Sequence, residues 1–164
     1  RWSKFVAAAR RHRYRAIERA LDHWTLAMPR RIQGVIFSDL GQASKFMALD
    51  WVQEALRQRL GFAPYPATLN LQPSTPPDAR LWEEIQRKVA AVPLAPIPTG
   101  FCSAGIYFVS LQRLIDGDET VKGAVLLPAV VDYPKDKIEV VAQVRIKDAL
   151  SVKDGDRLVL EFDD

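Results

Sequence analysis

The sequence predicts a compact, mainly β domain, a mostly antiparallel barrel that carries helical insertions. A chain of 164 residues, 48% of them hydrophobic and 26% charged, is long enough to enclose one sizeable core. Beyond residue 32 the chain consists largely of short runs of β-branched, aromatic and other apolar residues, separated by turn residues. Only two segments of that part have helical spacing without Gly or Pro. Many short strands with two helices are typical of a small decorated barrel.

The chain opens with a basic extension, residues 1–31, that we expect to be helical. Residues 3–26 lack Gly and Pro and are rich in Ala, Arg and Leu. The extension holds nine Lys and Arg against two acidic residues, and its run Arg10–Arg15 suits a phosphate backbone. Nucleic acid is therefore an alternative partner. We favour a solvated helix face whose apolar side packs on the barrel domain, residues 32–164, or on a symmetry mate, because one basic helix is not a recognisable DNA-reading unit.

Seven segments of the barrel domain have the composition of strands and are bounded by turn residues. In chain order they are Gly34–Phe37, Lys45–Leu49, Thr68–Leu71, Gly105–Ser110, Gly123–Leu127, Ile138–Ala142 and Arg157–Phe162. The stretch Val92–Gly100 contains three prolines, so it is expected to cross the surface in an extended form. The turn Lys153–Asp156 leads into the last strand.

Two helices are predicted between these strands. The first spans Asp50–Leu60, and its inner face is formed by Val52, Ala55, Leu56 and Leu60. The second spans Asp78–Val89, follows a pair of prolines, and places Leu81, Ile85 and Val89 on one side. Both helices are therefore expected to pack an apolar stripe onto the barrel.

The composition also restricts the class of protein. No apolar run approaches the roughly 20 residues that a membrane-spanning helix needs, so no membrane partner is expected. Cys102 is the single cysteine, which excludes an internal disulfide and a cysteine-based zinc cluster. We therefore expect a protein of the reducing cytoplasm.

The segment Thr68-Leu69-Asn70-Leu71 is the most informative motif of the chain. In a strand, alternate side chains share a face, so Thr68 and Asn70 point one way while the two leucines point the other. A hydroxyl and a carboxamide held side by side suit a hard cation such as Mg²⁺, whose other ligands would be waters and phosphate oxygens. The alternative, favoured on the pair alone, is a half-buried strand whose polar face meets solvent.

Four ordered blocks of sequence carry a resemblance to a known family. They are residues 34–46 (GVIFSDLGQASKF), 60–71 (LGFAPYPATLNL), 123–142 (with GAVLLP and YPKDKIEVVA) and 153–156 (KDGD). Together they resemble the archaeal-type, CTP-dependent riboflavin kinases, over about residues 33–162. The resemblance implies a six-stranded cradle-loop barrel that transfers a phosphoryl group from CTP to the 5′-hydroxyl of riboflavin, giving CDP and FMN. It also implies Mg²⁺ as cofactor.

The resemblance assigns the metal and nucleotide residues position by position. It implies that Thr68 and Asn70 are the Mg²⁺ ligands. The family's nucleotide loop reads Gly-x-Gly-Glu-Gly, and here the corresponding positions are Asp39, Leu40, Gly41, Gln42 and Ala43, followed by Ser44. Of the three glycines only Gly41 remains, so a positive φ at Asp39 or Ala43 would cost free energy. Asp39 also brings a negative charge towards a polyphosphate. The alternative for this loop is an ordinary strand-to-strand turn.

The flavin end is likewise assigned by resemblance. Glu139 stands at the family's flavin-contacting glutamate, and with Asn70 it is the implied catalytic pair. The family's threonine position reads Val131, where a hydrogen bond worth roughly 0.5–1.5 kcal/mol would be lost. A second nucleotide-contacting stretch comprises Val144, Arg145, Ile146 and Lys147. Its alternative is the exposed start of a helix.

Two functions from different classes follow. The first is an Mg²⁺-dependent, CTP-using riboflavin kinase. The second is a module that kept the barrel, binds a flavin or nucleotide, and lost catalysis. The substitutions at Asp39, Gln42, Ala43 and Val131 motivate the second function.

Overall fold

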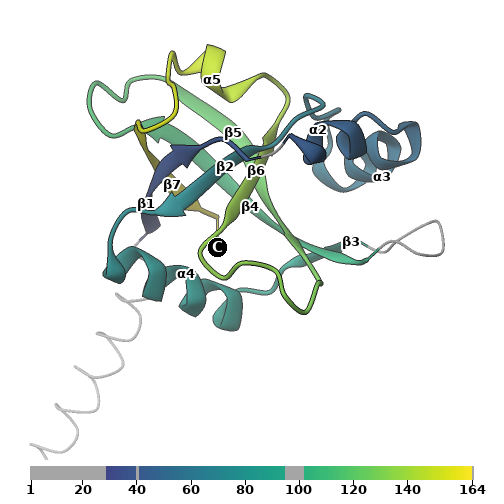
Figure 1. Ribbon diagram of the computed structural model, residues 1–164, viewed down its shortest axis with the longest axis horizontal. Helices are drawn as coiled ribbons and strands as arrows, with labels where there is room; N and C mark the ends of the chain where they lie inside the picture. Colours follow the sequence, from purple (N-terminus) through teal and green to yellow (C-terminus); the bar gives the residue numbers. More distant parts are fainter. Residues whose placement is uncertain (1–28, 40, 95–101, 164) are drawn as a thin grey trace, which may run out of the picture.

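The computed structural model describes residues 29–39, 41–94 and 102–163 (Figure 1). The predicted N-terminal helix therefore lies outside the described residues. The strands are β1 (Arg30–Phe37), β2 (Leu69–Pro73), β3 (Val92–Leu94), β4 (Ala104–Arg113), β5 (Thr120–Pro128), β6 (Ile138–Ala142) and β7 (Arg157–Phe162). The helices are α2 (Gln42–Met47), α3 (Asp50–Leu60), α4 (Pro76–Lys88) and α5 (Ile146–Ala149).

Six strands close into an antiparallel barrel, as predicted. Their order is β4–β5–β6–β2–β1–β7, and a further pairing of β7 with β4 completes the circle. The strand β4 is long enough to hold two partners along one edge, since its residues 104–106 pair with β3 and its residues 109–113 pair with β7. The three-stranded junction at β4 is therefore both the closing seam and the point where β3 extends the sheet.

Strand alternation fills the barrel. Ile32 and Ile36 of β1 and Leu158 and Leu160 of β7 are almost fully buried, while their neighbours along each strand are more exposed. Each such side chain contributes roughly 1.5–3 kcal/mol of burial free energy. A Cβ at Gly34 would lie 3.1 Å from the Cβ of Leu71, so β1 and β2 pack closely at this point.

The amphipathic helix α4 lies under the barrel and completes this core (Figure 1). Its N-cap is Thr75, whose hydroxyl accepts a hydrogen bond from the backbone N–H of Asp78. Its buried residues are Trp82 and Ile85. The Trp82 ring stacks on Phe162 at a centroid distance of 5.7 Å, which ties the helix to the end of β7.

A second apolar cluster forms on the outer side of the barrel. Met47 of α2 and Val52, Leu56 and Leu60 of α3 pack with side chains from β4, β5 and β6, which are Ile106, Ala124 and Val141. The four predicted inner residues of the first helix are all buried. The two helices therefore stand off one wall of the barrel, on the right in Figure 1, and a cavity lies between them and the strands.

The prediction for one segment was wrong. Lys45–Leu49 was expected to be a strand, but α2 occupies Gln42–Met47 because Gly41 adopts the left-handed conformation (φ 71°, ψ 11°) and turns the chain into a helix. Met47 then reaches the second cluster. In the stretch 92–100, Val92–Leu94 is extended, as expected, and also pairs with β4, while residues 95–100 lie outside the described residues. Within the described residues, no helix is long and apolar enough to cross a membrane.

Candidate functional site

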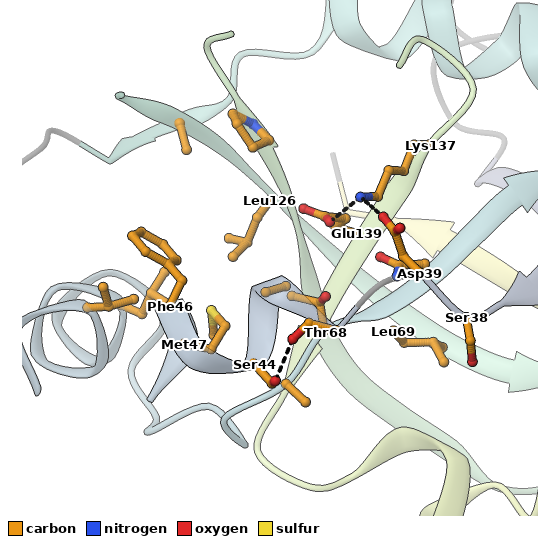
Figure 2. A pocket seen from close by; sticks show the side chains of 18 of the residues that line it. Ser38, Asp39, Ser44, Phe46, Met47, Thr68, Leu69, Leu126, Lys137 and Glu139 are labelled. Atoms are coloured by element: carbon orange, nitrogen blue, oxygen red, sulfur yellow. Dashed lines mark hydrogen bonds and ion pairs between the residues drawn. The ribbon is translucent and has the colours of Figure 1, made fainter. Parts of the chain in front are cut away.

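A cavity of about 760 Å³ lies between the barrel wall and the helices α2 and α3. Its apolar part includes Phe46, Met47, Trp51 and Leu126. Its polar part is formed by the end of β1, the start of β2 and the start of β6, and includes Asp39, Thr68, Asn70, Lys137 and Glu139. Figure 2 shows Phe46, Met47 and Leu126 on one side of the site and the ion-paired group of Asp39, Lys137 and Glu139 on the other.

The register of the sheet places the key polar residues next to each other. Asn70 of β2 pairs with Phe37 of β1 on one side and with Glu139 of β6 on the other, and Glu139 pairs in turn with Leu126 of β5. Directly paired residues of antiparallel strands present their side chains on the same face. All four residues line the cavity, so this row forms its wall.

The motif Thr68–Leu71 has the two-faced arrangement expected from its alternation. Leu69 and Leu71 belong to the core of the barrel, and Thr68 and Asn70 line the cavity, to whose lining Leu69 also contributes. Asn70 is only 8% exposed, and no described residue donates a hydrogen bond to its buried Oδ1 atom. A buried acceptor without a partner costs about 1–3 kcal/mol. The buried position of the Asn70 Oδ1 atom is explained if this oxygen binds a ligand.

The donor set fits a hard cation. Thr68 and Asn70 offer neutral oxygens, the type of ligand that Mg²⁺ accepts alongside waters and phosphates. In the described part of the chain, no group of three or more His, Cys, Asp or Glu side chains could hold a metal by itself. A cation at this place would therefore depend on a phosphorylated ligand for charge neutralisation.

Lys137 joins the two carboxylates of the cavity. Its Nζ atom lies 2.8 Å from Oδ2 of Asp39 and 2.8 Å from Oε1 of Glu139. The Lys137 and Glu139 side chains are 16% and 12% exposed, whereas Asp39 is 44% exposed. The bridge therefore runs from the half-exposed loop after β1 to the protected start of β6.

The cluster changes the proton affinity of two side chains. Burial alone would lower the pKa of Lys137, but hydrogen bonds to Asp39 and Glu139 outweigh it and raise the pKa of its ammonium group. The pKa of Tyr133 is raised above its ordinary value, first by burial and then by the charge of Glu139. The Tyr133 ring lies 5.8 Å from Nζ of Lys137, and its hydroxyl has no partner of good geometry within the described structure. Lys137 therefore stays charged and Tyr133 stays neutral at pH 7.

Two further basic residues line the cavity near α5. Lys147 donates to Asp154 at 2.7 Å and to the Ser38 hydroxyl at 3.4 Å. The hydrogen bond from Lys147, followed by that from Ser38, lowers the pKa of Asp154. Arg145 donates to Asp148 at 2.6 Å. These pairs place two cations at the edge of the cavity, where each is already matched by a carboxylate.

The predicted nucleotide loop follows β1 along the cavity. Asp39, Gly41, Ala43 and Ser44 are all lining residues, and the Ser44 hydroxyl donates to the carbonyl oxygen of Gly41 at 2.7 Å. Leu40 lies outside the described residues. Gln42 begins α2, and its side chain is also outside the described part. The loop therefore leads into a helix, in contrast to the strand-to-strand turn that was the alternative.

Three predicted site residues have other surroundings. Val131 is fully exposed, in the loop after β5, and does not line the cavity. Val144 is 46% exposed and also lies outside the lining. Ile146 is buried in the barrel core. In the stretch 144–147 only Arg145 and Lys147 reach the cavity, and the stretch does start a helix, since Arg145 is the N-cap of α5.

Sequence reasoning missed Lys137 and the aromatic side of the cavity. Lys137 stands two residues before Glu139, so strand alternation places both on one face and could have identified it. The contact between the Phe46 and Trp51 rings, with centroids 5.6 Å apart, depends on the helical form of α2, whereas Lys45–Leu49 was expected to be a strand.

The fold and the cavity together define a class: a small closed antiparallel β-barrel with a half-apolar, half-charged ligand site against its outer wall. The model of the CTP-dependent riboflavin kinase family, also described as domain of unknown function DUF120, matches residues 36–162. The chain belongs to this family.

Curated relatives support the same grouping. The chain is similar to the riboflavin kinase of Pyrobaculum arsenaticum, with 34% identity over 133 residues, and to that of Pyrobaculum calidifontis, with 32% over 131 residues. Each match covers 80% of this chain and 60% or 59% of the relative. The riboflavin kinase of Methanoregula boonei is 31% identical over 139 residues, which cover 85% of this chain and 57% of the relative. The chain thus spans about 60% of the length of these relatives.

Proposed function

We propose that this domain is a riboflavin kinase, which transfers the terminal phosphoryl group of CTP to the 5′-hydroxyl of riboflavin. The family and the relatives named riboflavin kinase support this reaction. The observation that carries it is the pairing of Asn70 with Glu139 across β2 and β6, inside a cavity with an aromatic side. A planar ring system suits Phe46 and Trp51, and a charged, phosphorylated group suits the opposite, polar side.

The residues of the polar side would have different roles in the phosphoryl transfer. Thr68 and Asn70 would hold Mg²⁺, which supplies charge neutralisation to the phosphates when bound. Gly41 and its neighbours would approach the phosphates, and Arg145 and Lys147 would offset charge at the edge of the cavity. Glu139 would orient the reacting hydroxyl of riboflavin. No strong nucleophile is needed, because phosphoryl transfer depends mostly on positioning and electrostatics.

The transfer exchanges one phosphorus–oxygen bond for another. The riboflavin hydroxyl oxygen bonds to the terminal phosphorus of CTP, the bond from that phosphorus to the bridging oxygen breaks, and the hydroxyl proton passes to the Glu139 carboxylate. The products are FMN and CDP. Glu139 is the lining carboxylate placed next to Asn70, so it is the residue we assign to the acceptor hydroxyl.

The experiment is a direct assay with a matched variant. The protein is incubated with riboflavin, magnesium and each of the four nucleoside triphosphates, and the flavins are separated by chromatography. We expect FMN with CTP, and its loss in Asn70→Ala. Gln58→Ala is the control, because it removes an exposed carboxamide on α3 that does not line the cavity. Absence of FMN with all four triphosphates would contradict the proposal.

A second candidate is a binding module without catalysis. Asp39 and Ala43, which replace family glycines, both line the cavity, and Val131 lies outside it. Calorimetry separates the two functions. Tight binding of a flavin or nucleotide without any FMN formation would favour the module, whereas rapid FMN formation would exclude it.

A further inference from the structure

Lys137 forms ion pairs with Asp39 and Glu139, two carboxylates whose negative charge the proposed function leaves unexplained. A bound triphosphate is strongly negative, yet the cavity wall carries the carboxylates of Asp39 and Glu139. Asp39 belongs to the loop expected to meet the phosphates, and Glu139 lies on the strand next to Asn70. Like charges at short range and in a partly buried site repel strongly. The site needs a cation that is held between these carboxylates and the ligand.

Lys137 is that cation by geometry. It contacts both carboxylates at 2.8 Å and is the least exposed of the ion-paired lysines in the described residues. The other two basic lining residues, Arg145 and Lys147, contact Asp148 and Asp154, which lie on or beside α5. Lys137 therefore neutralises the charge of the loop and of β6, and these other pairs do not.

The bridge also fixes positions. Asp39 and Lys137 are 98 residues apart in the chain, so their contact ties the loop after β1 to the segment that leads into β6. Glu139 is held from one side by the sheet register and from the other by Lys137. Because the Lys137 and Glu139 side chains are only 16% and 12% exposed, solvent screens this part of the bridge weakly.

We propose that Lys137 is a positioning and affinity-determining residue, which holds the Asp39 carboxylate against the start of β6 so that the cavity accepts a nucleoside triphosphate, and which orients Glu139. This inference rests on the proposed function. In this chain Lys137 forms an ion pair with Asp39. The pair neutralises the negative charge that Asp39 brings to a loop position where the family has glycine.

The test is a cycle of four proteins: wild type, Lys137→Met, Asp39→Asn and the double variant. Binding of CTP with magnesium is measured by calorimetry, and turnover is measured in parallel. We expect Lys137→Met to weaken binding about tenfold, because the cation that the Asp39 and Glu139 carboxylates share beside the phosphates is then lost. Adding Asp39→Asn should recover most of that loss, since it removes one of the two charges.

The controls separate this role from a structural one. Lys88→Met removes a lysine that pairs with Glu84 on the exposed side of α4, and it should leave nucleotide binding unchanged. Melting temperatures show whether each variant is folded, and Lys137→Gln replaces Lys137→Met if the latter does not fold. Rescue by Asp39→Asn is the deciding result, because a merely structural defect would not be repaired by removing a charge from the loop.

Three outcomes count against the inference. Nucleotide binding by Lys137→Met that equals wild type would overturn it and leave the kinase proposal intact. An equal loss on Lys137→Met with and without Asp39→Asn would show that the two residues are not coupled, and would overturn it as well. A wild type that neither binds CTP nor forms FMN would remove the kinase proposal and this inference together.

Discussion

The two halves of the candidate site are built in different ways. Asn70 and Glu139 stand on β2 and β6, where each residue has a paired strand on both sides. Asp39 and Gly41 stand on the loop between β1 and α2, and Ser44 follows in the first turn of α2. The contacts of this half include the Ser44–Gly41 hydrogen bond and the Lys137–Asp39 ion pair. Backbone ladders therefore position the strand half, whereas individual side chains position the loop half. Substitutions should accordingly act on chemistry in the first half and on nucleotide affinity in the second.

The largest effect is expected for Asn70→Leu, in the strand half. Loss of the carboxamide should lower turnover on the order of 1,000-fold, the upper range for one electrostatic contact in a transition state. The same change removes a buried acceptor that has no hydrogen-bond partner among the described residues, so the free energy of unfolding should rise by about 1 kcal/mol. Denaturant unfolding and the FMN assay measure the two effects. A folded and fully active variant would contradict the assignment of Asn70.

Glu139→Gln should come next, with kcat lowered about 100-fold, a typical loss for a group that assists proton transfer. The amide keeps the shape of the side chain but cannot form an ion pair with Lys137. Because Glu139 is assigned to the riboflavin hydroxyl, the KM for CTP should change much less than kcat. A large change in the KM for CTP with little change in kcat would show that Glu139 acts on nucleotide affinity, like the loop half, and would contradict the difference between the two halves.

Gly41→Ala tests the loop half with a matched control. Gly41 (φ 71°) and Gly61 (φ 80°) are both left-handed, and a Cβ at either one would meet no atom within 4 Å. Alanine should therefore cost about 1 kcal/mol of stability at each position, through backbone strain alone. Only Gly41→Ala should also raise the KM for CTP, by about fivefold. Equal KM values in the two variants would separate this loop from nucleotide binding.

The smallest effect is expected for the pair of Asp154 and Lys147 at low pH. The pKa of Asp154 is lowered from its ordinary value of 3.8, so its pair with Lys147 contributes stability above that value and loses it as the pH falls through the folded pKa. Lys147→Met should therefore move the pKa of Asp154 upward, and NMR titration of the side-chain carboxyl measures this. An unchanged pKa would indicate that Ser38 alone holds the carboxylate.

The sequence predicts the placement of the strand half more readily than that of the loop half, for physical reasons. Alternation of polar and apolar residues places Thr68 and Asn70 on one face of a strand, and register then brings Glu139 beside Asn70. The strand prediction for Lys45–Leu49 was wrong because short apolar runs are compatible with helix and strand, and the left-handed Gly41 decides between them. The Lys137–Asp39 contact joins residues 98 positions apart, and local patterns carry no information about such a pair.

The double use of β4 has a consequence for selectivity among small molecules. The ladder with β7 closes the cylinder, while the separate three-residue ladder with β3 carries Leu94 to the far wall of the cavity, beside Ala104. Different residues of β4 thus close the barrel and hold the strand that contributes to the cavity wall. We therefore expect that substitutions in β3 alter the dimensions of the cavity, while the hydrogen bonds between the six strands of the barrel are kept.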